Sequence, residues 1–204
     1  MDNQDYLNQI AAKPTPNSKR FFSPFIIKII IAAVAALALI ITLGGVMSSI
    51  NNHTTALYQS FYLRLHNLSS DTGPIATFSR YIKSSELRAL AGTLKSSLNA
   101  SSQNFTSVLA EMEISTTEIN PDAAASDAAV IAEYTQTLQD ARLNGLLDRT
   151  FANSTTLQIS LLLAIGSEIL ERNPTDNARV VVDQIMSGLE ILHTRFANYN
   201  NNSS

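Results

Sequence analysis

The stretch 85-SELRALAGTLKSSLNASSQNFTSVLAEMEI-114 carries apolar or small residues on one regular stripe. Successive members of the stripe are alternately four and three residues apart, which places them on one face of an α-helix. They are Leu87, Ala91, Leu94, Leu98, Ser101, Phe105, Val108 and Met112. Ser84 and Ser85 precede the stripe and suit the N-cap position, because a serine hydroxyl accepts a bond from an otherwise unpaired amide. The stretch therefore predicts a long helix with one buried face.

The closing segment of the chain repeats this pattern. Its stripe has the same alternating spacing and consists of Ala178, Val182, Ile185, Leu189, Leu192, Phe196 and Tyr199. Thr175 is placed to cap this helix, and Pro174 ends whatever precedes it. Two such stripes predict a helical bundle. The same spacing serves for packing within one chain and between chains, so both remain open.

Residues 122–172 contain no proline and are long enough for two further helices. The first is predicted over 122–142, and the second over 146–172. Asn144-Gly145 is the expected turn because both residues tolerate a left-handed backbone, and one kinked helix is the alternative. The second helix is apolar on more than one face, so it is predicted to lie most centrally. Inward positions of the first helix are Ile131, Tyr134, Leu138 and Ala141.

Upstream, residues 56–68 place Leu57, Phe61, Leu65 and Leu68 on one face. This segment is expected to continue from the apolar stretch that precedes it, and Asp71-Thr72-Gly73-Pro74 ends it. Residues 75–82 are predicted to form a short helix. There is no alternating strand pattern and no repeat of fixed period.

The stretch 29-IIIAAVAALALIITLGGVM-47 has no charged residue. Roughly twenty apolar residues cross a bilayer core of ~30 Å, so residues 24–49 are predicted to be a transmembrane signal-anchor helix in contact with the lipid bilayer. A cleaved signal peptide has a shorter apolar region of about 7–15 residues.

Basic residues predict the orientation of this span. Lys13, Lys19, Arg20 and Lys28 lie before it or at its start, and Arg64 is the first Lys or Arg after it. The bias predicts a cytoplasmic amino terminus and an extracytoplasmic carboxyl terminus in a single-pass protein of the cell membrane.

The predicted fold is therefore all-α, with an N-terminal transmembrane helix followed by an extracytoplasmic antiparallel bundle of about four helices. Its parts are a mostly disordered cytoplasmic tail (1–23), the signal-anchor helix (24–49), the bundle (50–199) and a disordered tail (200–204).

Charge and cysteine content exclude several classes of function. The formal net charge is −3, and the part after residue 28 carries ten basic and fifteen acidic residues. No run of Lys and Arg favours nucleic acid, so no nucleic-acid partner is predicted. The chain has no cysteine, which excludes disulfides, thiol catalysis and cysteine-based metal sites. A bacterial surface protein is more typical of this composition than a eukaryotic ectodomain.

The histidines are His53, His66 and His193, and only His193 belongs to a suggestive motif, the E-x-x-H of Glu190 to His193. Helical di-metal sites need two such motifs with further inward glutamates, and this chain has one. Glu190 is expected to point outward, because Leu189 and Leu192 occupy the core positions. We therefore predict no catalytic residues, no metal site and no cofactor, and the protein is not predicted to be an enzyme.

The order of MDNQDYLNQI, a single apolar span, IKSSELRALAGTLKSSL, DARLNGLLDRTFA and LEILHTRFANY resembles an uncharacterised family of small single-pass membrane proteins of reduced-genome, Saccharibacteria-type bacteria. The resemblance covers nearly the whole chain and implies no activity. Leu143 to Phe151 and His193 are also similar to a turn and a late histidine of ferritin-like helical bundles, whose other histidines are missing here.

These observations predict a membrane-anchored helical bundle that acts as a structural or protein-interaction module at the cell surface. Its partner would be another protein or a second copy of the chain. One alternative is a ligand-sensing ectodomain that signals through a partner. A ferritin-like metal-binding protein is the other alternative.

Overall fold

The computed structural model describes residues 50–202 of the chain. The described part forms six α-helices and no strand. They are α3 (Ile50–Ser69), α4 (Pro74–Ser79), α5 (Ser85–Glu111), α6 (Pro121–Leu143), α7 (Leu147–Glu171) and α8 (Asp176–Asn202). The predicted all-α bundle is confirmed for this part of the chain.

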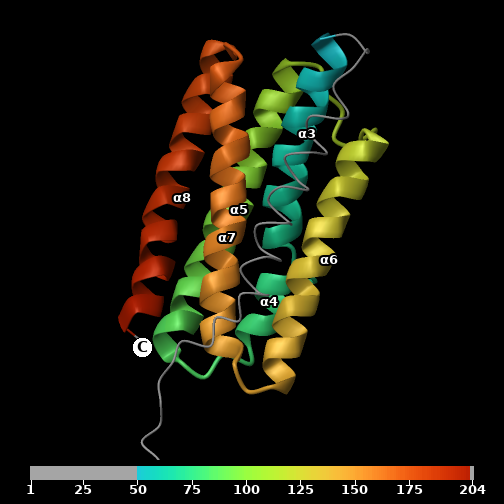
Figure 1. Cartoon of the computed structure of the whole chain (residues 1–204). Helices are drawn as coiled ribbons and strands as arrows, with labels where there is room; N and C mark the ends of the chain where they lie inside the picture. Colours follow the sequence, from blue (N-terminus) through green and yellow to red (C-terminus); the bar gives the residue numbers. More distant parts are fainter. Residues whose placement is uncertain (1–49, 203–204) are drawn as a thin grey trace, which may run out of the picture. The chain divides into compact units, whose positions relative to one another are not determined.

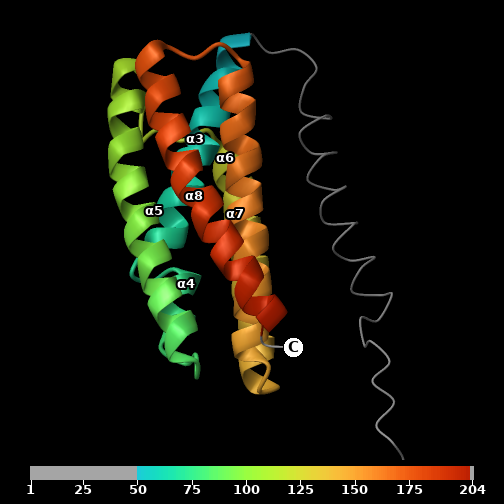
Figure 2. The ribbon, with the colours of Figure 1, turned by 90° about the vertical axis from the view of Figure 1, so that its left-hand side faces the viewer.

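The long helices lie roughly side by side and alternate in direction along the chain (Figures 1 and 2). Helices α3, α6 and α8 run one way, and α5 and α7 run the other way. Helix α3 packs against α5, α6 and α7, while α8 packs against α5 and α7. The short helix α4 contacts α3, α5 and α6. The bundle thus has five long helices rather than about four, because α3 joins the core.

Both predicted heptad stripes are buried. The stripe of α5 is buried from Leu87 to Val108, and the stripe of α8 is buried from Ala178 to Phe196. Phe61 and Phe105 pack edge to face with ring centroids 5.0 Å apart, so α3 and α5 share one core. Burial of these large side chains contributes about 1.5–3 kcal/mol each and is the main source of stability.

Among the long helices, α3 has the fewest exposed residues over its described part, and α7 has more. Between His53 and Ser69 only His66 is exposed. Helix α7 exposes a full stripe of side chains, consisting of Arg149, Asn153, Leu157, Ala164, Ser167 and Glu171. The prediction that residues 146–172 lie most centrally was wrong, because four other helices surround α3 whereas one side of α7 faces solvent.

Local signals for helix ends are confirmed. The Ser84 hydroxyl accepts from the Leu87 amide at 3.2 Å, and Thr175 Oγ1 accepts from the Ala178 amide at 3.2 Å. Gly145 has a φ of 71°, so Asn144-Gly145 is a turn between two helices and not a kink. These features depend on neighbouring residues alone, which is why they could be predicted.

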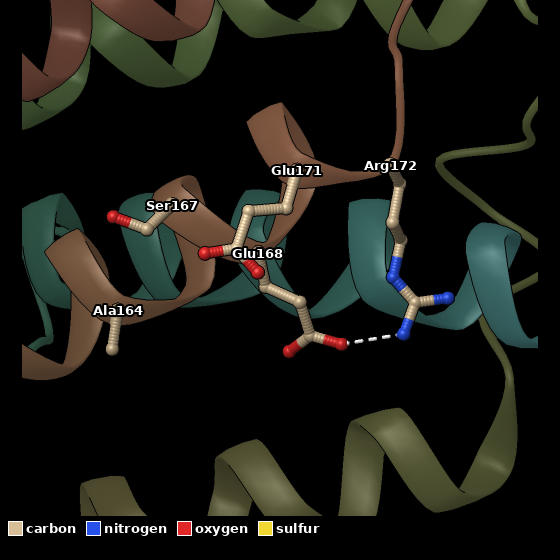
Figure 3. A pocket seen from close by; sticks show the side chains of 5 residues that line it. All are labelled: Ala164, Ser167, Glu168, Glu171 and Arg172. Carbon is tan, nitrogen blue, oxygen red and sulfur yellow. Dashed lines mark hydrogen bonds and ion pairs between the residues drawn. The ribbon is translucent and has the colours of Figure 1, made fainter.

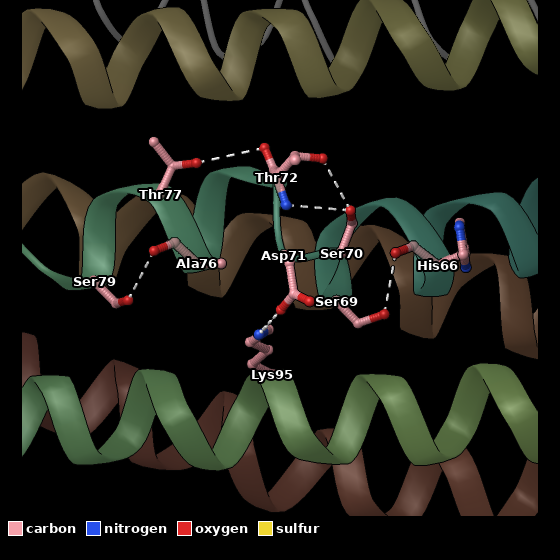
Figure 4. Close-up of polar contacts among 9 residues, drawn as sticks. All are labelled: His66, Ser69, Ser70, Asp71, Thr72, Ala76, Thr77, Ser79 and Lys95. Carbon is pink, nitrogen blue, oxygen red and sulfur yellow. Dashed lines mark hydrogen bonds and ion pairs between the residues drawn. The ribbon is translucent and has the colours of Figure 1, made fainter.

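The turn between α3 and α4 is held by hydroxyl groups (Figure 4). Ser70 Oγ accepts from the Thr72 amide at 3.3 Å, and Thr77 Oγ1 donates to the Thr72 carbonyl at 3.4 Å. A Cβ on Gly73 would lie 2.4 Å from the Asn67 carbonyl oxygen, so the chain passes too close there for any side chain.

Two predictions concern the ends of the chain. Helix α8 continues to Asn202, so the predicted disordered tail (200–204) begins too early, since extending an existing helix by one turn costs little. The predicted tail (1–23) and span (24–49) lie outside the described residues. Within residues 50–202, no helix is both long and apolar enough to cross a membrane.

Candidate functional site

The most unusual feature of the core is a buried ion pair. Arg64 of α3 donates through Nε to Asp127 Oδ1 of α6, and the two side chains are only 6% and 3% exposed. The second carboxylate oxygen of Asp127 accepts from Asn67 Nδ2 at 2.6 Å. Arg64 Nη1 also donates to Gln158 Oε1 of α7 at 3.3 Å. One charged cluster therefore joins three helices.

The geometry of this cluster restricts how α3, α6 and α7 can align. Desolvation of two buried charges offsets most of their attraction, so a buried pair is weak evidence of net stabilisation. Loss of one partner is much worse, because the other charge stays buried and unpaired. Any sliding of α3 against α6 would separate Arg64 from Asp127. The cluster consequently favours a single register of the core.

Gln59 binds the loop between α5 and α6 to α3. Its Nε2 donates to the carbonyls of Ser115 and Glu118, both at 3.0 Å. Its Oε1 accepts from the Asn120 amide at 2.9 Å. Gln59 is 2% exposed, and these three bonds satisfy backbone groups that the loop would otherwise leave unpaired. Its role is structural.

A buried tyrosine completes the polar part of the core. The hydroxyls of Tyr134 and Thr155 lie 2.7 Å apart. Burial raises the pKa of Tyr134 far above its ordinary value, and the bond to Thr155 lowers that pKa by less. Burial also raises the pKa of Tyr58. Both phenols therefore stay protonated at neutral pH, and the Tyr134 hydroxyl takes part in a hydrogen bond within the core.

His193, the histidine of the E-x-x-H motif, contacts a serine. Its Nε2 lies 3.0 Å from Ser160 Oγ of α7. The same hydroxyl donates to the Thr156 carbonyl at 3.0 Å. A serine has one hydroxyl proton, and the donor in the contact with His193 depends on the tautomer of the imidazole. The pair links α7 and α8.

Glu190, His66 and His53 do not form a metal-binding group with His193 among the described residues. Glu190 is exposed, as the buried Leu189 and Leu192 require. His66 is exposed and stacks on Tyr62, with ring centroids 5.8 Å apart. His53 lies on the same helix, about 20 Å from His66 at the rise of an α-helix. Among residues 50–202, no three His, Asp or Glu side chains are grouped to hold a metal ion.

A hollow of about 580 Å³ lies beside the carboxyl-terminal half of α7 (Figure 3). The described residues that line it are Ala164, Ser167, Glu168, Glu171 and Arg172. Arg172 Nη2 donates to Glu168 Oε1 at 2.6 Å, so the cation in this lining is already paired. Small-molecule sites usually need polar groups that converge from several elements. These residues come from one helix and its cap, and they do not specify a ligand.

The polar residues of the core were not predicted as a group. Asp127 continues the inward stripe of Ile131 and Tyr134 by four residues, so its burial had a signal in the sequence. Arg64 lies three residues after the inward Phe61 and four before the inward Leu68, so its spacing also places it on the buried face. Its partner lies 63 positions away, and only packing brings the two together.

Comparisons with known proteins give no relative: no protein family, curated protein or solved structure matches the chain. The resemblance to small single-pass membrane proteins of reduced-genome bacteria therefore stays a prediction.

Proposed function

We propose that the protein is a membrane-anchored structural or protein-interaction module. Residues 24–49 would anchor it in the cell membrane, and the helical bundle would be displayed on the extracytoplasmic side. The anchor rests on the charge-free stretch Ile29–Met47 and on the four basic residues before or at the start of the span.

The proposed role of the bundle rests on one observation: its potentially reactive side chains form hydrogen bonds and an ion pair with one another. Arg64 and Asp127 bind each other, Tyr134 binds Thr155, and Ser160 binds both His193 and a carbonyl. Groups engaged in this way hold helices together and make the core rigid. Such a bundle is suited to presenting a surface in a constant shape.

Cysteine labelling tests the topology directly, because the natural chain has no cysteine. We expect a membrane-impermeant maleimide to label Ser96→Cys, on an exposed position of α5, in intact cells. Ser18→Cys should react only after the membrane is opened. Labelling of Ser18→Cys in intact cells, or of neither site before lysis, would contradict the proposed orientation.

Cross-linking in the native membrane with mass-spectrometric identification tests the interaction role. A stoichiometric protein partner, or a second copy of the chain, is the expected product. Capture of neither, together with turnover or a bound metal in the purified chain, would replace the proposal with an enzymatic or metal-binding role.

A further inference from the structure

One end of the bundle is formed by two short connections that are joined to each other. The Asp148 carboxylate accepts from the backbone amides of Lys83 and Ser84 at 3.0 and 2.8 Å. The guanidinium of Arg142 lies 4.7 Å from the centroid of the Tyr81 ring. These contacts hold the α4–α5 connection beside the α6–α7 turn, at the lower end of the bundle in Figure 1.

Three large apolar side chains are exposed at this end. Leu143 and Leu146 are 71% and 60% exposed, and Tyr81 is 45% exposed. The two leucines flank Gly145 at the apex of the turn, and side chains that exposed project from the surface instead of lining a groove. Single exposed leucines are ordinary, but three large apolar residues on two joined connections indicate an interaction surface.

The same two connections and the residues beside them are rich in basic side chains. Residues 79–88 and 139–150, here called the basic end, contain five basic and three acidic residues, a net charge of +2. Residues 111–122 and 168–179, the acidic end, contain two basic and seven acidic residues, a net charge of −5. Arg80, Lys83 and Arg142 have no ion pair among the described residues. The acidic chain therefore has one end with a net positive charge, which its linear sequence conceals.

We propose that the basic end binds an anionic phospholipid surface. Exposed leucines at a turn can insert shallowly among lipid headgroups, and a tyrosine with neighbouring arginines suits the interfacial layer. Arg80, Lys83 and Arg142 would meet the phosphates, whose charge is opposite to theirs. The surface belongs to the bundle alone, so this inference goes beyond the proposed function and does not rest on the anchor.

The absence of tryptophan from the chain makes the test site-specific. Leu146→Trp places a single reporter at the basic end. Ile191→Trp places one on the side of α8, where the native residue is similarly exposed at 63%. The full-length chain is reconstituted in neutral phosphatidylcholine nanodiscs, and vesicles with brominated acyl chains are added. These vesicles contain phosphatidylcholine alone or phosphatidylcholine with phosphatidylglycerol.

We expect the Leu146→Trp emission to shift to shorter wavelength and to be quenched by the phosphatidylglycerol vesicles only. The Ile191→Trp emission should not change. In the Leu146→Trp background, Arg80→Gln with Lys83→Gln should abolish the quenching. Arg172→Gln with Arg179→Gln, the same change of charge at the acidic end, should leave it intact. Circular dichroism checks that every variant is folded.

Several results would overturn the proposal. One is quenching of Leu146→Trp by vesicles of phosphatidylcholine without phosphatidylglycerol. Others are equal quenching at both reporter positions and no quenching at either position. The last is quenching that persists in the variant without Arg80 and Lys83. A shift caused by soluble polyglutamate but not by the vesicles would assign the surface to an acidic protein instead. A chain that fails to enter nanodiscs would contradict the proposed anchor. It would then be titrated directly with the same vesicles. Failure of the anchor and failure of lipid binding by the basic end are therefore distinguishable.

Discussion

Helix α3 has a polar composition but is buried, whereas helix α7 is more apolar and has one exposed side. Helix α3, INNHTTALYQSFYLRLHNLS, is rich in Asn, Gln, His and Ser, yet only His66 is exposed between His53 and Ser69. Helix α7 contains LQISLLLAIGSEIL and nevertheless exposes one stripe along its length. Leu157 of that stripe remains 37% exposed.

The difference shows that burial depends on what surrounds a helix as well as on its own apolar content. Helix α3 is surrounded by α4, α5, α6 and α7, so its polar side chains have partners within reach. Gln59 and Arg64 meet those partners on the α5–α6 loop, on α6 and on α7. A polar residue is tolerated in a core when its hydrogen bonds are made, and α3 satisfies this condition.

The largest expected effect comes from breaking the charged cluster of α3. Asp127→Ala should lower the free energy of unfolding by about 3–5 kcal/mol, because Arg64 is left buried without its partner. Denaturant titration of the detergent-solubilised chain measures the change. Glu133→Ala, at an exposed position of the same helix, is the control and should stay within about 0.5 kcal/mol.

Arg64→Met combined with Asp127→Leu removes both charges and should recover most of that loss, since an apolar pair can replace a buried ion pair. If Asp127→Ala behaves like Glu133→Ala, the cluster does not position α3.

The next effect concerns the amide of Gln59. Gln59→Leu should cost about 1–3 kcal/mol, because three backbone groups of the α5–α6 loop lose their partner. Gln103→Leu, at an exposed position of α5, should change stability by less than about 0.5 kcal/mol. Hydrogen exchange of the amides in 115–120 provides a second measurement and should accelerate in the first variant only.

A smaller effect tests the packing of α7 against α8. A Cβ on Gly166 would lie 2.8 Å from Met186 Sδ, whereas a Cβ on Gly92 of α5 would meet nothing within 4 Å. Gly166→Ala should destabilise, because overpacking of about 1–3 kcal/mol exceeds the gain in helix propensity. Gly92→Ala should stabilise by about 0.5–1 kcal/mol. Thermal unfolding measures both variants. If Gly166→Ala raises the thermal midpoint as much as Gly92→Ala does, the Met186 side chain moves aside without cost.

The smallest effect is expected at the exposed ion pair between Asp71, just beyond α3, and Lys95 of α5. The hydrogen bond and charge of Lys95 lower the pKa of Asp71 below its ordinary 3.8. A lowered pKa means that the contribution is present above pH 3.8 and is lost as the pH falls through the folded-state pKa. The free energy of unfolding of Asp71→Asn should therefore be slightly lower than that of the natural chain at neutral pH. The two values should converge in acid. If the difference in free energy of unfolding between the two chains grows in acid, the ion pair with Lys95 is not its cause.

Local features of this protein were predictable because each depends on a few neighbouring residues. The heptad stripes of α5 and α8, the caps at Ser84 and Thr175 and the turn at Gly145 all follow from spacing or from backbone preference. The apolar stretch Ile29–Met47 predicts a membrane span on the same local basis, because its length and lack of charge need no partner to be recognised.

The position of α3 at the centre and the pairing of distant charges depend on how the helices pack. Arg64 and Asp127 are 63 positions apart, and the cations of the basic end come from two connections that the sequence separates by about as many residues. Pairing over such distances depends on how the helices pack, and local periodicity carries no information about it. The helices and their buried faces therefore follow from local sequence patterns. The charged cluster within the core and the cationic end of an otherwise acidic bundle follow from packing.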